Sequence, residues 1–143
     1  MERNDLILLV IAAAEDRGLT PVQLQKSVFL IGESKLPGLP TYSYEFIPYN
    51  YGPFSLDVYS DADQLASEGM IGYMPVPARS WQKYALTQKG LRLSEEIETQ
   101  GSEKLVKYVK EVVSWVKSHT FSDLLRAIYA KYPEFRVNSV FQG

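Results

Sequence analysis

The chain has 143 residues, of which 45% are hydrophobic and 22% charged, and its formal net charge at pH 7 is -2. This length and composition are typical of one soluble globular domain with a single core. The slightly acidic balance excludes a generally cationic nucleic-acid binder or a polybasic membrane binder, but it is compatible with a local basic patch.

The residue types also narrow the chemistry. The chain has no cysteine, which excludes disulfides, thiol catalysis, Fe–S clusters and cysteine-based zinc sites. Its single histidine, His119, argues against a histidine-based metal site. The longest apolar run, residues 6–14, is shorter than the about 20 residues that a membrane span needs. We expect a cytoplasmic protein that is not an enzyme and needs no cofactor or metal.

Two helices are predicted at the start of the chain. The first begins near Asn4, a favourable N-cap residue, and ends at Gly18. The second begins at Thr20, with Pro21 at its first position and Gln23 placed to close a capping box. A turn over residues 35–40 ends it. The apolar residues of the first helix form a stripe at helical spacing: Leu6, Leu9, Val10 and Ala13.

An aromatic segment over residues 42–54 follows. Tyr42, Tyr44 and Phe46 alternate with polar residues, which predicts a short strand that Pro48 limits. Residues 50–53 have turn chemistry. Ser55 is then predicted to cap a third helix that runs to about residue 68.

The rest of the chain predicts a hairpin and three more helices. Residues 70–74 and 81–86 are the expected strands, and Thr87 caps a helix over 88–99. A fifth helix follows residues 101–102, and Thr120 opens a sixth. The fifth has apolar residues at helical spacing: Leu105, Val109, Val112 and Val116.

This order of elements predicts a mainly α protein with a small β-hairpin, of the α+β class. Helices followed by a two-stranded hairpin are typical of a winged helix–turn–helix, which we place in residues 1–100. Residues 101–143 are then a C-terminal helical extension. Its two helices carry more apolar residues than one contact stripe needs, so we expect either a homodimer through them or packing back onto residues 1–100.

Three segments resemble a known family. They are LTPVQLQKSVFLIGE, YNYGPFSLDVYSDADQLASEGMI and YALTQKG, which together resemble winged-helix proteins related to the Panacea domain, the SocA-like antitoxins and the YwgA-like bacterial proteins. The Leu24-Gln25-Lys26 sequence and the Tyr51-Gly52-Pro53 turn carry the resemblance. It implies a winged helix that binds protein partners, as an antitoxin or proteolytic adaptor, and does not catalyse a reaction.

The third helix is a poor candidate for reading DNA. Residues 52–72 contain no lysine or arginine, and Asp57, Asp61 and Glu68 share one face of this helix. The carboxylates of such a face repel the phosphates of DNA. This face is either a solvated charged surface or a docking face for a partner with basic groups. The candidate partner-binding residues are Tyr49, Tyr51, Asp57, Asp61 and Glu68.

The alternative is a dimeric transcriptional regulator that contacts DNA through its wing and its C-terminal helices. Cationic and aromatic residues at the tip of the predicted hairpin and on the fifth helix suit phosphate and groove contacts. The candidates are Arg79, Trp81, Lys83, Lys104 and Lys107.

Two further predictions concern the aromatic segment. We expect Gly52 to adopt a backbone angle, or a close approach, that a Cβ atom would disturb, with Pro53 fixing the entry to the third helix. We expect Lys26 to hydrogen-bond this segment in a structural role. The first hypothesis for function is thus a non-enzymatic winged-helix protein, antitoxin-like or regulatory, that works through protein contacts.

Overall fold

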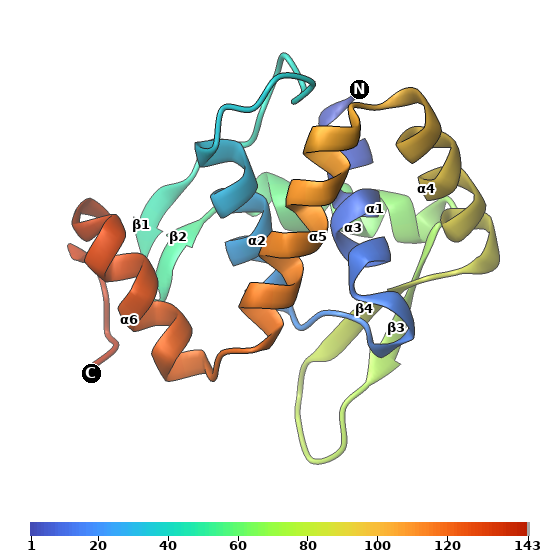
Figure 1. Cartoon of the computed structure of the whole chain (residues 1–143). Helices are drawn as coiled ribbons and strands as arrows, with labels where there is room; N and C mark the ends of the chain where they lie inside the picture. The colour runs from blue at the N-terminus through green and yellow to red at the C-terminus, as the bar shows by residue number, and fades with distance from the viewer. Residues whose placement is uncertain (143) are drawn as a thin grey trace.

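A computed structural model describes residues 1–142, and within them six α-helices and two antiparallel β-hairpins form a mainly α, α+β fold (Figure 1). The helices are α1 Arg3–Ala13, α2 Pro21–Glu33, α3 Leu56–Ser67, α4 Gln88–Gln100, α5 Glu103–Lys117 and α6 Phe121–Lys131. The strands are β1 Ile47–Tyr49, β2 Gly52–Phe54, β3 Ile71–Pro75 and β4 Gln82–Leu86. Two short 3-10 helices, η1 Glu15–Arg17 and η2 Pro133–Arg136, complete the order. None of the helices in this part of the chain is long and apolar enough to span a bilayer.

The central element is α1. All six residues from Leu6 to Ile11 are buried, with at most 4% of each exposed. Leu6, Leu9 and Val10 of the predicted stripe are among them, and burial extends beyond the stripe because α2, α3, α4 and α5 all contact this helix. A helix that is apolar on every side belongs in the middle of a core.

The N-terminal boundary of α1 also differs from the prediction. Glu2, not Asn4, is the N-cap, and its capping box closes on Asp5. Gly18 does not end α1, which ends at Ala13: it has a φ of +68° and follows the three-residue η1. The capping box of α2 is confirmed, since the Thr20 hydroxyl accepts from the Gln23 amide at 3.1 Å.

The predicted strand over residues 42–46 is wrong. Tyr44 is buried and Ser43 and Glu45 are exposed, so the side chains alternate, but the segment pairs with no strand of residues 1–142. The strand lies just beyond it: β1 pairs with β2, with Pro48 opposite Pro53, around a two-residue turn. This hairpin was missed because three-residue strands that contain proline give almost no sequence signal.

The second hairpin, β3–β4, follows the prediction closely. Its register runs from Ile71 opposite Leu86 to Pro75 opposite Gln82, and its long loop extends away from the helices (Figure 1). Leu19 docks this hairpin onto the link between α1 and α2 through two backbone hydrogen bonds with Tyr84, of 2.9 and 2.8 Å.

Helix α5 lies against α1 and α2 in the same core (Figure 1). The four apolar residues predicted for its buried side are buried, at 7% exposure or less: Leu105, Val109, Val112 and Val116. The division of the chain at residue 100 and the homodimer through α5 and α6 stay predictions.

Candidate functional site

Two side chains of α2 fix the segment that carries the exposed tyrosines. Gln25 is buried and pairs with both backbone groups of Ser55: its Nε2 donates to the carbonyl oxygen at 2.8 Å, and its Oε1 accepts from the amide at 3.0 Å. The Lys26 ammonium donates to the Pro53 carbonyl oxygen at 2.9 Å. The Leu-Gln-Lys and Tyr-Gly-Pro sequences therefore meet in space, and together they position the start of α3.

Gly52 completes this turn. Its φ is +88°, in the left-handed region that favours glycine, and a Cβ atom there would lie 3.5 Å from the Tyr129 ring of α6. The turn directs the neighbouring side chain outward: Tyr51 is 45% exposed, and its ring meets Phe121 edge-on at 5.4 Å. The β1–β2 turn and the start of α6 thus form one aromatic surface.

That surface borders an apolar cavity of about 550 Å³, which we name the Trp81 cavity. It lies where the first turn of α2, the β1–β2 turn, the β3–β4 loop and the start of α6 converge. Trp81 is 41% exposed and Phe121 44% exposed. The lining residues are Thr20, Pro21, Val22, Gln23, Tyr51, Trp81, His119, Phe121 and Leu124.

The acids of α3 belong to a different part of the molecule, where α1 partly neutralises them. Arg3 lies 3.3 Å from Asp57 and 3.0 Å from Asp61, and the Tyr44 hydroxyl donates to Asp61 at 2.7 Å. Burial, reinforced by this hydrogen bond, raises the pKa of Tyr44 well above its usual value. Asp61 is thus part of a half-buried network; Asp57 is exposed but paired with Arg3, and Glu68 is exposed.

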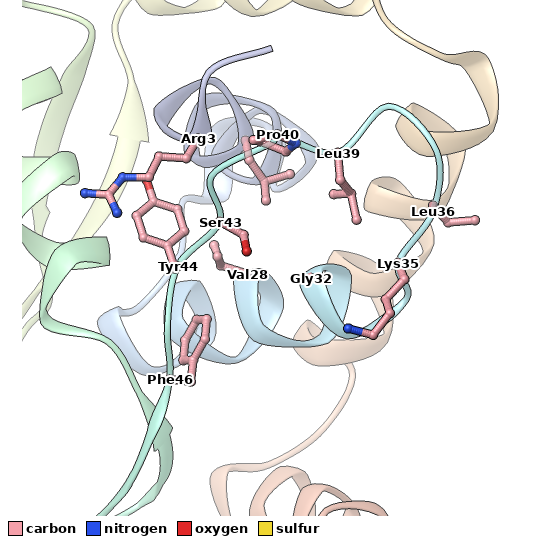
Figure 2. Close-up of a pocket in the computed structure, with 11 residues that line it drawn as sticks. Arg3, Val28, Gly32, Lys35, Leu36, Leu39, Pro40, Ser43, Tyr44 and Phe46 are labelled. Carbon is pink, nitrogen blue, oxygen red and sulfur yellow. The ribbon is translucent and has the colours of Figure 1, made fainter.

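A smaller cavity of about 230 Å³ adjoins this network, between α2 and the loop over residues 36–46 (Figure 2). The figure shows Lys35 on one side and Arg3 on the other, with the Arg3 guanidinium directed away from the cavity. That guanidinium lies 4.7 Å from the centre of the Tyr44 ring and is matched by the α3 carboxylates. The group that best suits an anionic ligand is therefore already occupied.

The structure places the candidate binding residues predicted from the sequence in groups that differ from the predicted ones. Tyr51 and Trp81, predicted for two different functions, line the same cavity, whereas Tyr49 stacks on Phe54 at 5.0 Å and is not among the lining residues. Arg79 is exposed on the β3–β4 loop, and Lys83 lies on β4.

The cationic candidates for DNA contact are split between two ends of the molecule. Lys104 and Lys107 lie in the first turns of α5, at the opposite end of that helix from the β3–β4 loop (Figure 1). At 1.5 Å per residue, Lys104 is about 20 Å along the helix from its last residue, Lys117. The five candidates therefore do not form one patch.

Sequence reasoning missed Phe121, Leu124 and Arg3. Phe121 directly follows the Thr120 cap of an amphipathic helix, and nothing in that pattern indicates that its ring meets Tyr51, seventy positions earlier. Arg3 is similarly distant from Asp57. Contacts of this kind depend on the packing of whole helices, which local patterns do not contain.

The described residues contain no group of three His, Cys, Asp or Glu side chains that could hold a metal ion. No protein-family model and no curated protein matches the chain. The resemblance to the Panacea-related family therefore stays a prediction.

Proposed function

We propose that this chain is a winged helix–turn–helix protein, antitoxin-like or regulatory, that acts by binding another protein and catalyses no reaction. The Trp81 cavity is the observation that carries the proposal. Tyr51, Trp81 and Phe121 are exposed around one apolar hollow, and exposed aromatic groups that border a pocket are typical of the energetic centres of protein interfaces. Contiguous apolar surface on a monomer commonly marks such an interface.

The electrostatics of α3 support a protein partner over DNA. In a winged helix this helix enters the major groove, where phosphates flank it. Its exposed side carries Asp57 and Asp63, Glu68 follows at its C-cap, and Arg3 is the cation that pairs with Asp57 and Asp61. Phosphates would therefore approach a surface of their own sign.

DNA binding by a dimer is the second candidate, because Arg79, Trp81 and Lys83 all lie on or beside the β3–β4 hairpin loop, where a wing contacts the backbone. The scattered positions of Lys104 and Lys107 weaken it, since a single duplex must reach both ends of α5.

Two measurements on the full chain test the proposal. Fluorescence anisotropy with random duplex DNA at low salt is expected to show no binding tighter than about 1 μM, and tight, salt-sensitive binding would instead support the regulator. Affinity purification from the native host is expected to yield one protein that re-forms the complex from purified components. Titration calorimetry then gives the affinity, and the absence of a reconstituted complex would contradict the proposal.

A further inference from the structure

Residues 138–141 lie along the free side of β1 and against α6 (Figure 1). The Asn138 carboxamide donates to the Pro48 carbonyl oxygen at 3.1 Å, and the Val140 amide donates to the Asn50 carbonyl oxygen at 3.0 Å. Within residues 1–142, β1 pairs with β2 alone, so this side of the strand has no other strand beside it. We name the surface that receives the segment the Asn50 site. Its residues are Pro48, Asn50, Phe121, Arg126 and Tyr129.

The free side of β1 offers hydrogen-bond acceptors to an extended chain. Pro48 lies opposite Pro53, and neither residue has an N–H group, so this pair cannot exchange ladder hydrogen bonds and the Pro48 carbonyl faces away from β2. Asn50 adds a second carbonyl on the same side, two positions further on. An extended peptide binds such an edge with its own N–H groups, which supply the main-chain part of strand addition.

A hydroxyl group is recognised at the second position of the segment. The Ser139 hydroxyl accepts from the Tyr129 hydroxyl at 2.7 Å and from the Phe141 amide at 3.0 Å. It also donates to the Asn50 carbonyl oxygen at 3.3 Å, so its hydrogen and both of its lone pairs are used. Tyr129 is 5% exposed, and its hydroxyl therefore meets the segment from a ring that the fold holds in place.

An aromatic ring is recognised at the fourth position. The centre of the Phe141 ring lies 6.2 Å from that of Phe121 and 6.4 Å from that of Tyr129. The Arg126 guanidinium lies 5.9 Å from the same ring centre. Val140, between the two recognised residues, contributes its amide, while the residue itself is 58% exposed. The site thus selects a carboxamide, a hydroxyl and an aromatic ring at the first, second and fourth positions of a segment.

The segment lies at the surface and adds nothing to the core. None of its four residues is among the buried core residues, and Val137, which leads into it, is 74% exposed. Hydrogen bonds at the surface contribute little net stability, because water competes for the same groups. Tethering keeps the segment in place, since it gives an effective concentration of about a millimolar. A second tethered segment can therefore displace it.

We infer that the Asn50 site binds an extended segment of the protein partner, with a carboxamide, a hydroxyl and an aromatic side chain in this order, and that residues 138–141 occupy the site in its absence. This inference rests on the proposed function and adds a second contact to it. Phe121 belongs both to the Asn50 site and to the Trp81 cavity, so a partner bound at the cavity brings its chain to the edge of the site. The partner's segment is then tethered as well and competes with residues 138–141 on comparable terms.

Heteronuclear NMR of the isotope-labelled full chain tests the inference with a capped heptapeptide, Arg-Val-Asn-Ser-Val-Phe-Gln, which has the sequence of residues 136–142. The receiving protein carries Ser139→Ala and Phe141→Ala, which weaken its own segment and leave the Asn50 site unchanged. In this double variant the peptide should shift the amides of residues 49–51, 121 and 126–130. The natural chain should bind the peptide at least about tenfold more weakly, because its own segment is in place. Val140→Ala is the matched control and should exclude the peptide as the natural chain does, because this side chain is exposed.

Peptide and site variants test the predicted selectivity. Peptides with Ser139→Ala or Phe141→Ala should bind the double variant about tenfold more weakly, whereas Val140→Lys should change the affinity less than about twofold. Adding Tyr129→Phe to the protein should abolish the difference between the serine peptide and its alanine form, because the hydroxyl that the serine meets is then absent. Tyr42→Phe, at a tyrosine that is 83% exposed and outside the Asn50 site, should leave that difference unchanged.

Amide hydrogen exchange in the natural chain measures how readily the segment leaves. The Val140 amide should exchange at least about a hundredfold faster than the buried amides of α1, because the segment opens without unfolding of the core. Equal protection would mean that the segment leaves only on global unfolding, and it would overturn the inference.

The other contrary outcomes are distinct. Failure of the peptide to bind the double variant, equal affinities of the serine and alanine peptides, or a large loss with Val140→Lys would each overturn the inference. The double variant should bind the reconstituted partner about tenfold more tightly than the natural chain does, because its own segment competes less. Equal affinity for the partner overturns the inference while the proposed function stands. If no partner complex forms at all, the proposed function fails by its own test, and the peptide titration shows separately whether the Asn50 site accepts a segment from another molecule.

Discussion

At the scale of single residues, Lys26 makes the free energy of unfolding depend on pH. It is 3% exposed, its ammonium donates to the Pro53 carbonyl, and burial lowers its pKa to about 8. In the unfolded chain the same amine has a pKa near 10.4. Between these two values the unfolded state holds the proton and the folded state does not, so the free energy of unfolding rises with pH from about 8 upward.

The measurement is urea denaturation at pH steps from 7 to 9.5. The free energy of unfolding should rise by about 1–2 kcal/mol over this range in the natural chain, and most of that rise should be absent from Lys26→Met. The range stops below pH 10 because half-buried tyrosines such as Tyr59, whose pKa desolvation raises to about 12, have the opposite effect on the free energy of unfolding above that pH. The same pH slope in both proteins would show that Lys26 is not the group responsible.

A second residue-scale prediction concerns Gly90, in the first turn of α4. A Cβ atom there would lie 2.0 Å from the carbonyl oxygen of Met70, so backbone must move to admit it. We expect Gly90→Ala to lower the free energy of unfolding by about 2–4 kcal/mol, measured by thermal or urea denaturation. Gly32→Ala in α2 is the control, because a Cβ there meets nothing within 4 Å and alanine favours the helix. If the Gly90→Ala protein were as stable as the natural chain, α4 and the Met70 carbonyl would not be as close at Gly90 as described.

At the scale of elements, the Gln25 side chain of α2 holds the start of α3 through its two hydrogen bonds with the Ser55 backbone. Gln25→Ala would leave both the amide and the carbonyl of Ser55 buried without these partners. We expect a loss of about 2–4 kcal/mol in the free energy of unfolding. Gln64→Ala, on the exposed side of α3, should cost less than about 0.5 kcal/mol. Equal effects of the two substitutions on the denaturation midpoint would show that this clamp contributes nothing.

Element boundaries with side-chain signals could be read from the sequence. Thr20, Thr87, Ser102 and Thr120 each cap a helix with their hydroxyl, and three of these caps were predicted: Thr20, Thr87 and Thr120. Ser55 was also predicted as a cap, and it holds the N-cap position of α3, but its side chain makes no capping hydrogen bond. The β1–β2 hairpin could not be read, because its strands have three residues each and both contain proline. The hairpin is held in place instead by the hydrogen bonds of Gln25 with Ser55 and of Lys26 with Pro53, and both side chains come from more than twenty positions earlier in the chain.

The candidate site was predictable only in part, for a related reason. The sequence indicates Tyr51 as part of an aromatic turn and Trp81 as part of the tip of a hairpin. Their convergence depends on α6, which returns Phe121 to the β1–β2 turn. Arg3 similarly changes the electrostatics of α3 from another helix. A sequence pattern shows which residues lie on one face of an element, and tertiary packing decides which faces meet.

At the scale of the whole molecule, α5 covers the apolar sides of α1 and α2 and so completes the core. It lies against both α1 and α2, and Leu105, Val113 and Val116 on it are fully buried. Removing residues 101–143 would expose the apolar sides of α1 and α2 that this helix covers. We expect the chain of residues 1–100 to lose cooperative thermal unfolding, to bind a hydrophobic dye and to aggregate.

The matched control is a shorter deletion, of residues 137–143. The described part of this tail lies on the β1–β2 turn, where the Val140 amide and the Asn138 side chain donate to backbone oxygens of Asn50 and Pro48. Its loss should lower the melting temperature by only a few degrees, because it removes no residue of the core, although the Tyr129 hydroxyl loses Ser139 as its acceptor and the Phe141 ring contacts are lost. Calorimetry and light scattering distinguish the two deletions. If residues 1–100 remain monodisperse and unfold cooperatively, they form an autonomous domain, and α5 is an addition to the core and not a part that the fold requires.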